Sequence, residues 1–201
     1  MYVAVEALRL ARTELLVLAV GGGALAAVDM NTGGLVRAPL PGDCALAPYD
    51  IATAALADVE NPDPAQPDAF ELTEPLELAG RIRGRKAERY IRPLLHPTDE
   101  PLLGLVTAAV PYWTLCGDRP SVAVVDTGGS IEIIRHARRL HCFFEWRGSV
   151  IDLPVVDRRV SISMAQRGQQ TLRLRRRFVV ALTPPYEGNC YKVVAGLLPR
   201  G

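Results

Sequence analysis

Short apolar runs separated by turn residues fill the first forty positions of the chain. Residues 15–20 are apolar, three glycines follow at 21–23, and residues 24–28 are apolar again. Residues 29–34 read Asp-Met-Asn-Thr-Gly-Gly, which are types that favour tight turns, and an extended pattern resumes at 35–36. This alternation predicts two successive hairpins, and therefore an N-terminal β-meander.

Two proline-rich stretches interrupt the apolar runs of the N-terminal half. Residues 38–50 and residues 60–68 contain three prolines each. Each proline removes a backbone donor and disfavours helix at the residue before it. Both stretches are therefore predicted to be surface loops.

The charge pattern changes near the middle of the chain. Arginines alternate with other residues over 81–85, and residues 86–92 suit a short helix that Pro93 ends. Residues 100–112 have an apolar spacing that suits either a short helix or a strand. The segment 79–118 is therefore predicted to be a basic, partly helical connector.

Extended patterns return in the C-terminal half. The apolar runs 122–125 and 131–134, with Asp-Thr-Gly-Gly between them, predict a hairpin. Residues 172–182 begin with strict alternation and predict a strand, and residues 191–198 predict a last apolar strand. Short strands separated by turns, with few helices, indicate an all-β barrel or sandwich class.

The two halves share one short stretch of similar sequence, which we call the Thr-Gly-Gly echo. Residues 26–36 and 122–131 both read apolar strand, acidic turn with Thr-Gly-Gly, apolar strand. Duplication and convergent turn chemistry both explain this similarity. We predict a mainly β fold of two barrel-like halves, 1–78 and 119–201, on either side of the connector.

Three stretches of the chain resemble one known family. They are Ala-Ala-Val-Asp-Met-Asn-Thr-Gly-Gly-Leu-Val-Arg at 26–37, Phe-Phe-Glu-Trp-Arg-Gly with Asp-Leu-Pro-Val-Val-Asp at 143–157, and the closing stretch 178–195. Their order and composition are similar to the bacterial dual OB-containing domain, a family seen among defence-associated proteins. The resemblance implies two tandem OB-like β-barrel halves, which host many ligands and also protein partners. At 21–26 the family's polar segment is replaced by Gly-Gly-Gly-Ala-Leu-Ala, so no ligand contact is carried over there.

The net charge of the chain is close to zero, which excludes a strong electrostatic field over the whole protein. The 201 residues include 23 Lys and Arg against 22 Asp and Glu, so an anionic partner must be met by a local patch. The four cysteines are far apart, so we expect no metal, no cofactor and no dense disulfide framework. The apolar run 15–28 is too short to span a bilayer, and Glu6 and Glu14 interrupt its flank. We expect a cytoplasmic protein without membrane contact.

Three arginine clusters are candidate anion-binding patches, with aromatic residues as candidate stacking platforms. The predicted nucleic-acid-binding residues are Arg81, Arg83, Arg85, Lys86, Arg89, Arg135, Arg138, Arg173, Arg175, Arg177 and Trp146. Trp113, Phe144 and Tyr186 are further candidate platforms. Solvated strand faces explain each arginine cluster as well, and core packing explains the aromatics.

Asp126-Thr-Gly matches the signature of aspartic peptidases, whose chemistry needs two carboxylates sharing one proton. The other Thr-Gly-Gly turn offers Asn31 in place of a second Asp, so only a homodimer could build that dyad. A turn explains Asp126 through backbone preference alone.

No enzyme activity is predicted. The predicted function is a non-catalytic binding module that engages single-stranded nucleic acid or nucleotides. The alternatives are a protein-interaction module with a protein partner in a larger assembly, and a homodimeric aspartic peptidase. The oligomeric state stays open.

Overall fold

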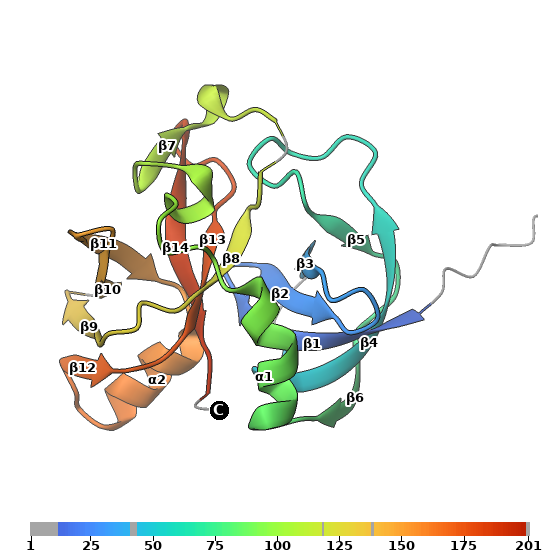
Figure 1. Cartoon of the computed structure of the whole chain (residues 1–201), viewed down its shortest axis with the longest axis horizontal. Helices are drawn as coiled ribbons and strands as arrows, with labels where there is room; N and C mark the ends of the chain where they lie inside the picture. Colours follow the sequence, from blue (N-terminus) through green and yellow to red (C-terminus); the bar gives the residue numbers. More distant parts are fainter. Residues whose placement is uncertain (1–11, 41–43, 118, 138, 200–201) are drawn as a thin grey trace, which may run out of the picture.

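The computed structural model describes residues 12–40, 44–117, 119–137 and 139–199. The chain is mainly β, as predicted, and its strands form two sheets that build two barrel-like halves (Figure 1). The first sheet contains β1 (Arg12–Gly21), β2 (Ala24–Asp29), β3 (Leu35–Pro39), β4 (Asp50–Asp58), β5 (Phe70–Leu72) and β6 (Glu77–Arg81). The second contains β7 (Ala109–Pro111), β8 (Val122–Val125), β9 (Ile131–His136), β10 (Arg139–Trp146), β11 (Ser149–Val155), β12 (Thr171–Leu174), β13 (Phe178–Leu182) and β14 (Asn189–Leu197). The helices are α1 (Arg85–Ile91), η1 (Arg92–Leu94), η2 (Leu102–Gly104), η3 (Tyr112–Thr114) and α2 (Arg158–Gln166).

The first half is a meander closed by returning strands. β2 pairs with β1 and β3 in antiparallel fashion, which confirms the two predicted N-terminal hairpins. The Asp29 carboxylate accepts a hydrogen bond from the N–H of Asn31 in the second turn, where Gly33 has a φ of 77°. β4 pairs with β1 and β5 with β4, and a parallel bridge joins Arg37 to Ala69 just before β5. The sheet therefore curls back on itself.

The second half repeats this connectivity. β9, β10 and β11 form a meander, β11 lies parallel to β14, and β14 pairs with β13. β12 pairs with β9, and β13 pairs with β8. In each half the strand after the meander therefore pairs with the first strand, and a later strand, β5 in the first half and β14 in the second, lies between the third and the fourth. β6, the last strand of the first half, also pairs with β4. This arrangement is an OB-like barrel.

One predicted hairpin is wrong. β8 and β9 do not pair with each other. β8 runs along β13 and β9 runs in the same direction along β12, so the two form one strand with an interruption between them. Two arginines from the segment between β12 and β13 hold the interruption: Arg177 Nε donates to Asp126 Oδ2 at 2.7 Å, and Arg175 Nη2 donates to the Gly128 carbonyl at 2.6 Å. The same interruption splits the strand predicted over 172–182 into β12 and β13.

The Thr-Gly-Gly echo therefore falls at different places in the two barrels. It joins β2 to β3 in the first half but interrupts the first strand of the second half. Convergent turn chemistry explains such an echo without duplication.

The connector contains the predicted helix as α1, which gives way to η1 with Pro93 inside it. Between 100 and 112, where the pattern suits helix and strand alike, the structure has η2 and β7. β6 pairs with β4 in the first sheet and β7 with β14 in the second, and the domain boundaries at 78 and 119 stay a prediction. In the part of the chain that the structure describes, no helix is long and apolar enough to cross a membrane.

A second helix, α2, lies where none is predicted. Its N-cap is Asp157, whose carboxylate accepts a hydrogen bond from the N–H of Arg159 at 3.0 Å. Val160 and Met164, four residues apart, are its buried positions. α2 connects the third and fourth strands of the second barrel.

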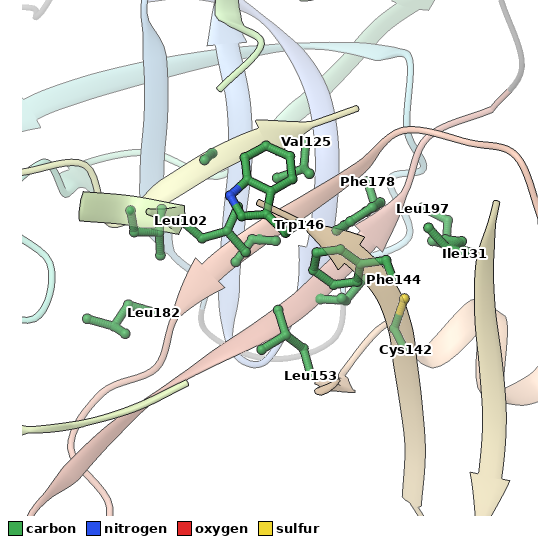
Figure 2. Close-up of a cluster of buried hydrophobic side chains, with 14 of the residues drawn as sticks. Leu102, Val125, Ile131, Cys142, Phe144, Trp146, Leu153, Phe178, Leu182 and Leu197 are labelled. Carbon is green, nitrogen blue, oxygen red and sulfur yellow. The ribbon is translucent and has the colours of Figure 1, made fainter. Parts of the chain in front are cut away.

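Hydrophobic cores fill both barrels and the space between them. The second barrel encloses Phe144, Trp146 and Phe178 with aliphatic neighbours, as Figure 2 shows. A separate core joins the halves through residues of β1, β2, β8, β13 and β14, which are Leu16, Leu18, Ala19, Ala26, Val28, Val122, Val124, Val179 and Ala195. The face formed by the second and third strands is the ligand face of many OB barrels. In the first half, β2 uses its outer side for packing against the second half.

Candidate binding groove

Two neighbouring cavities form a groove at the junction of the two barrels. The first cavity has a volume of about 570 Å³ and the second about 380 Å³. Both are lined by Tyr49, Arg176 and Pro199, so they are continuous. We call the two together the basic groove. In Figure 1 it lies at the lower side of the molecule, where α1 and α2 are found.

Each barrel contributes arginines to the first cavity. Arg81 and Arg83 come from the end of β6 and the loop after it, whereas Arg159 and Arg167 come from α2 and its C-terminus. Arg176 comes from the interruption between β12 and β13. The groove therefore brings Arg81 and Arg83 of the first predicted cluster together with Arg175, Arg176 and Arg177 of the third, although the two clusters lie about ninety residues apart in the sequence.

Two of these arginines are neutralised by neighbouring carboxylates. Arg81 Nε lies 2.5 Å from Asp50 Oδ1, its cross-strand partner on β4. Burial raises the pKa of Asp50, but the hydrogen bonds from Arg81 and a backbone N–H outweigh it, so this pKa lies below its ordinary value. Arg159 pairs with Asp157 at 3.2 Å. These two pairs are parts of the groove wall.

Three arginines of the first cavity keep their charge available. Among the described residues, Arg83, Arg167 and Arg176 make no ion pair within 4.0 Å. The Nε of Arg176 is buried and has no hydrogen-bond partner in that part of the chain. A buried donor without a partner costs about 1–3 kcal/mol. The first cavity is thus lined by three arginines without an ion-pair partner among the described residues.

The second cavity is held open by an ion-pair network. Arg177 Nη1 lies 2.6 Å from Glu88 Oε2 on α1, and its Nε binds Asp126. The hydrogen bond from Arg177 is the main cause of the lowered pKa of Asp126. Arg177 therefore ties α1 to the second barrel, and its charge is balanced by two carboxylates.

Tyr49 stands at the boundary of the two cavities in an unusual backbone conformation. Its φ is 74°, a left-handed value that bulky residues seldom adopt. The side chain is buried, and its hydroxyl donates to the Pro199 carbonyl at 3.1 Å. Backbone strain of this kind persists only where the surrounding contacts hold the residue in place, and it is concentrated at functional sites.

Helix α1 extends the basic surface beyond the groove. Arg85, Arg89 and Arg92 line an open hollow together with Glu88, which also lines the second cavity. Lys86 is exposed on the same helix. The strand β6 ends at Arg81, so Arg81, Arg83 and Arg85 do not form one strand face.

Some predicted residues lie away from the groove. Arg135 donates to the Ser161 carbonyl at 3.2 Å and thereby fastens α2 to β9. Arg173 is exposed and pairs with Glu132 at 3.3 Å, on the side of β12 opposite to the groove-lining Leu172 and Leu174. Arg138 lies outside the described residues.

The candidate stacking platforms divide into buried and exposed residues. Trp146 lies within the buried cluster of Figure 2 and is only 5% exposed. Its indole N–H donates to the Glu100 carbonyl at 2.9 Å. Because a stacking platform needs an open ring face, Trp146 and the equally buried Phe144 are core residues instead. Trp113 is 76% and Tyr186 65% exposed. Both flank the β7 region, at the opposite end of the molecule from the groove (Figure 1).

Other reactive groups have structural roles. Asp126 is paired with Arg177, whose hydrogen bond lowers the pKa of this carboxyl. The homodimeric peptidase alternative stays a prediction, because one carboxyl of such a dyad is ionised as well. Cys142 is fully buried, and burial raises its pKa to about 12. His141 Nδ1 lies 2.8 Å from Asp152 Oδ1 on the surface of the second barrel. In the described segments, no group of three or more His, Cys, Asp and Glu residues could hold a metal ion.

The candidate set from sequence lacks Arg159, Arg167 and Arg176, which the groove contains. Arg176 stands inside a predicted cluster. Arg159 and Arg167 become groove residues only through α2, whose start is signalled by Asp157 at the N-cap.

Comparison of the chain with family models, curated proteins and solved structures finds no match. The resemblance to dual OB-containing domains therefore stays a prediction, and the case for function rests on the groove.

Proposed function

We propose that this protein binds single-stranded nucleic acid through the basic groove between its two barrels. The observation that carries the proposal is the convergence of Arg83, Arg167 and Arg176 on one cavity, without carboxylate partners among the described residues. Phosphate contacts by arginine supply most of the affinity of sequence-independent binding.

The shape of the groove also supports a flexible strand. A series of hollows runs from the first cavity through the second to the surface of α1, with Tyr49 and Glu88 at the junctions. A single strand can bend to follow such a path. A channel with charges along it is the usual arrangement in proteins that bind single strands without sequence preference.

Salt titration tests the proposal. A labelled twelve-nucleotide oligo(dT) should bind with an affinity that falls steeply as salt concentration rises. Replacing Arg83 and Arg176 with Ala should reduce the slope of log K against log salt by about 1.4, because each lost phosphate contact removes about 0.7. The matched control is Arg173→Ala, which removes an exposed arginine on the far side of β12 and should leave the slope unchanged.

Two results would overturn the proposal. The first is absence of binding at low salt, where the phosphate contribution is largest. The second is an equal effect of Arg173→Ala and of the Arg83 and Arg176 substitutions.

A protein-interaction role is the second candidate, and a different observation favours it. Trp113 and Tyr186 are the largest exposed aromatics in the described part of the chain, and Trp113 packs within 3.5 Å of the position that a Gly188 side chain would occupy. Aromatic residues are enriched at protein interfaces. Under this role, Trp113→Ser with Tyr186→Ser would abolish partner binding and leave oligonucleotide affinity unchanged.

A further inference from the structure

The first cavity combines an apolar floor with a cationic rim. The floor is built by aliphatic side chains from both barrels, which are Ile82, Val160, Leu172, Leu174 and Leu197. The free arginines Arg83, Arg167 and Arg176 belong to the same lining. Its volume of about 570 Å³ lies within the range of cavities that hold small organic ligands.

A bare phosphate backbone would use only part of this cavity. Phosphate oxygens would reach the arginines, but they would leave the half-buried Ile82, Leu172 and Leu174 in contact with water. An unstacked nucleobase is flat and largely apolar on its faces, and proteins hold such bases against apolar side chains and arginine planes. The cavity therefore matches one nucleotide better than a string of phosphates.

We infer that the first cavity accepts one unstacked base of the bound strand, with the flanking phosphates on Arg83, Arg167 and Arg176. The inference rests on the proposed nucleic-acid binding and adds the class of group that the cavity recognises. The base enters between the β6 end of the first barrel and α2 of the second, so both barrels hold it. No base-specific hydrogen bond is implied, and the cavity takes bases of any sequence.

Position 163 allows the cavity to be filled without replacing a residue of the barrel cores. Ser163 lines the cavity from α2, one turn beyond Arg159 and Val160 and one turn before Arg167. A Ser163→Phe substitution places an aromatic ring in the space assigned to the base. Ala165 is exposed on the same helix and does not line the cavity, so Ala165→Phe is the matched control.

The experiment compares oligo(dT) of twelve nucleotides with an oligomer of equal length that has the same phosphates and sugars but no bases. We expect the wild-type protein to bind oligo(dT) about tenfold more tightly, which is the gain of one stacked base. Ser163→Phe should lower oligo(dT) affinity to that of the base-free oligomer, whereas Ala165→Phe should retain the tenfold preference. The salt slopes of the two oligomers should agree, because their phosphate contacts are the same.

Each outcome decides the inference. Equal affinity of the wild-type protein for both oligomers would overturn the base site and leave phosphate binding in place. A preference for oligo(dT) that survives Ser163→Phe would move the base contact elsewhere and would also overturn it. Failure of both oligomers to bind would instead overturn the proposed function itself. Thermal melts of both variants establish that they are folded.

Discussion

The two barrels approach each other closely at Gly196 of β14 and Ala19 of β1, and this contact yields a quantitative prediction. A Cβ atom built on Gly196 would lie 2.7 Å from the Ala19 Cβ and 3.2 Å from its Cα. Carbon atoms pack at about 3.5–4.0 Å, so Gly196→Ala requires the two strands to separate by about 1 Å. Both atoms belong to fixed backbone or to its first side-chain carbon, and neither can rotate away.

The expected cost of Gly196→Ala follows from this overlap. Overpacking of this kind costs about 1–3 kcal/mol, which exceeds the gain of about 0.4–1 kcal/mol from a less flexible unfolded chain. In a chain of this length the melting temperature should fall by roughly 2–12 °C, measured by calorimetry or by far-UV circular dichroism. Gly80→Ala in β6 is the control and should gain about 0.4–1 kcal/mol, because no atom lies within 4 Å of its Cβ position and only the unfolded-chain effect remains.

A compensating substitution separates close packing from a general effect on the strands. Ala19→Gly removes the opposing Cβ, so adding it to Gly196→Ala should recover most of the lost stability. Ala19→Gly alone should cost about 0.5–1 kcal/mol, the usual penalty of glycine within a strand. The reasoning is refuted if Gly196→Ala has the same melting temperature as the wild-type protein, or if the double variant is less stable than Gly196→Ala.

Two further predictions concern charged groups. Arg177→Met leaves Asp126 and Glu88 unpaired and should cost about 1–2 kcal/mol at pH 7, given their partial exposure. The pKa of Asp126 is lowered in the folded protein, so the ion pair with Arg177 stabilises the fold above the ordinary pKa of 3.8. This stabilisation is lost as the pH falls through the folded-state pKa. In urea titrations the stabilities of the wild-type protein and of Arg177→Met should therefore converge at that low pH. Burial lowers the pKa of Lys192 to about 8, so the unfolded chain binds more protons between pH 8 and 10.5 and stability should rise with pH in that window. Lys192→Met should abolish this rise, and an unchanged slope would contradict the assignment.

Local turn chemistry made the N-terminal meander predictable from sequence. The turn at 29–34 specifies its own geometry, because Asp29 binds the following N–H groups and Gly33 supplies the positive φ. The same reasoning gives the wrong result at Asp126-Thr-Gly-Gly. There the residues also suit a turn, but Arg177, from the segment between β12 and β13, binds Asp126, and the chain continues in the same direction. Tertiary contacts overrode the local signal.

The candidate site was predictable in its parts but not in its assembly. The clusters near 81 and 173 are visible as runs of arginine, yet only the closed second barrel brings Arg176 opposite Arg83. Periodicity could not separate Arg173, which points away, from its neighbours without the strand register. Trp146 has the composition of a stacking platform, but burial decides its role, and burial depends on the whole barrel.

Photocrosslinking tests the central claim most directly. A single-stranded oligonucleotide that carries 4-thiothymidine would be bound to the full chain at low salt, irradiated, and the crosslinked peptides identified by mass spectrometry. The account predicts crosslinks within the groove segments 47–49, 81–83, 159–167 and 172–176, and their loss on substitution of Arg83 and Arg176. Crosslinks confined to Trp113 and Tyr186 at the opposite end, or absence of any crosslink, would contradict it.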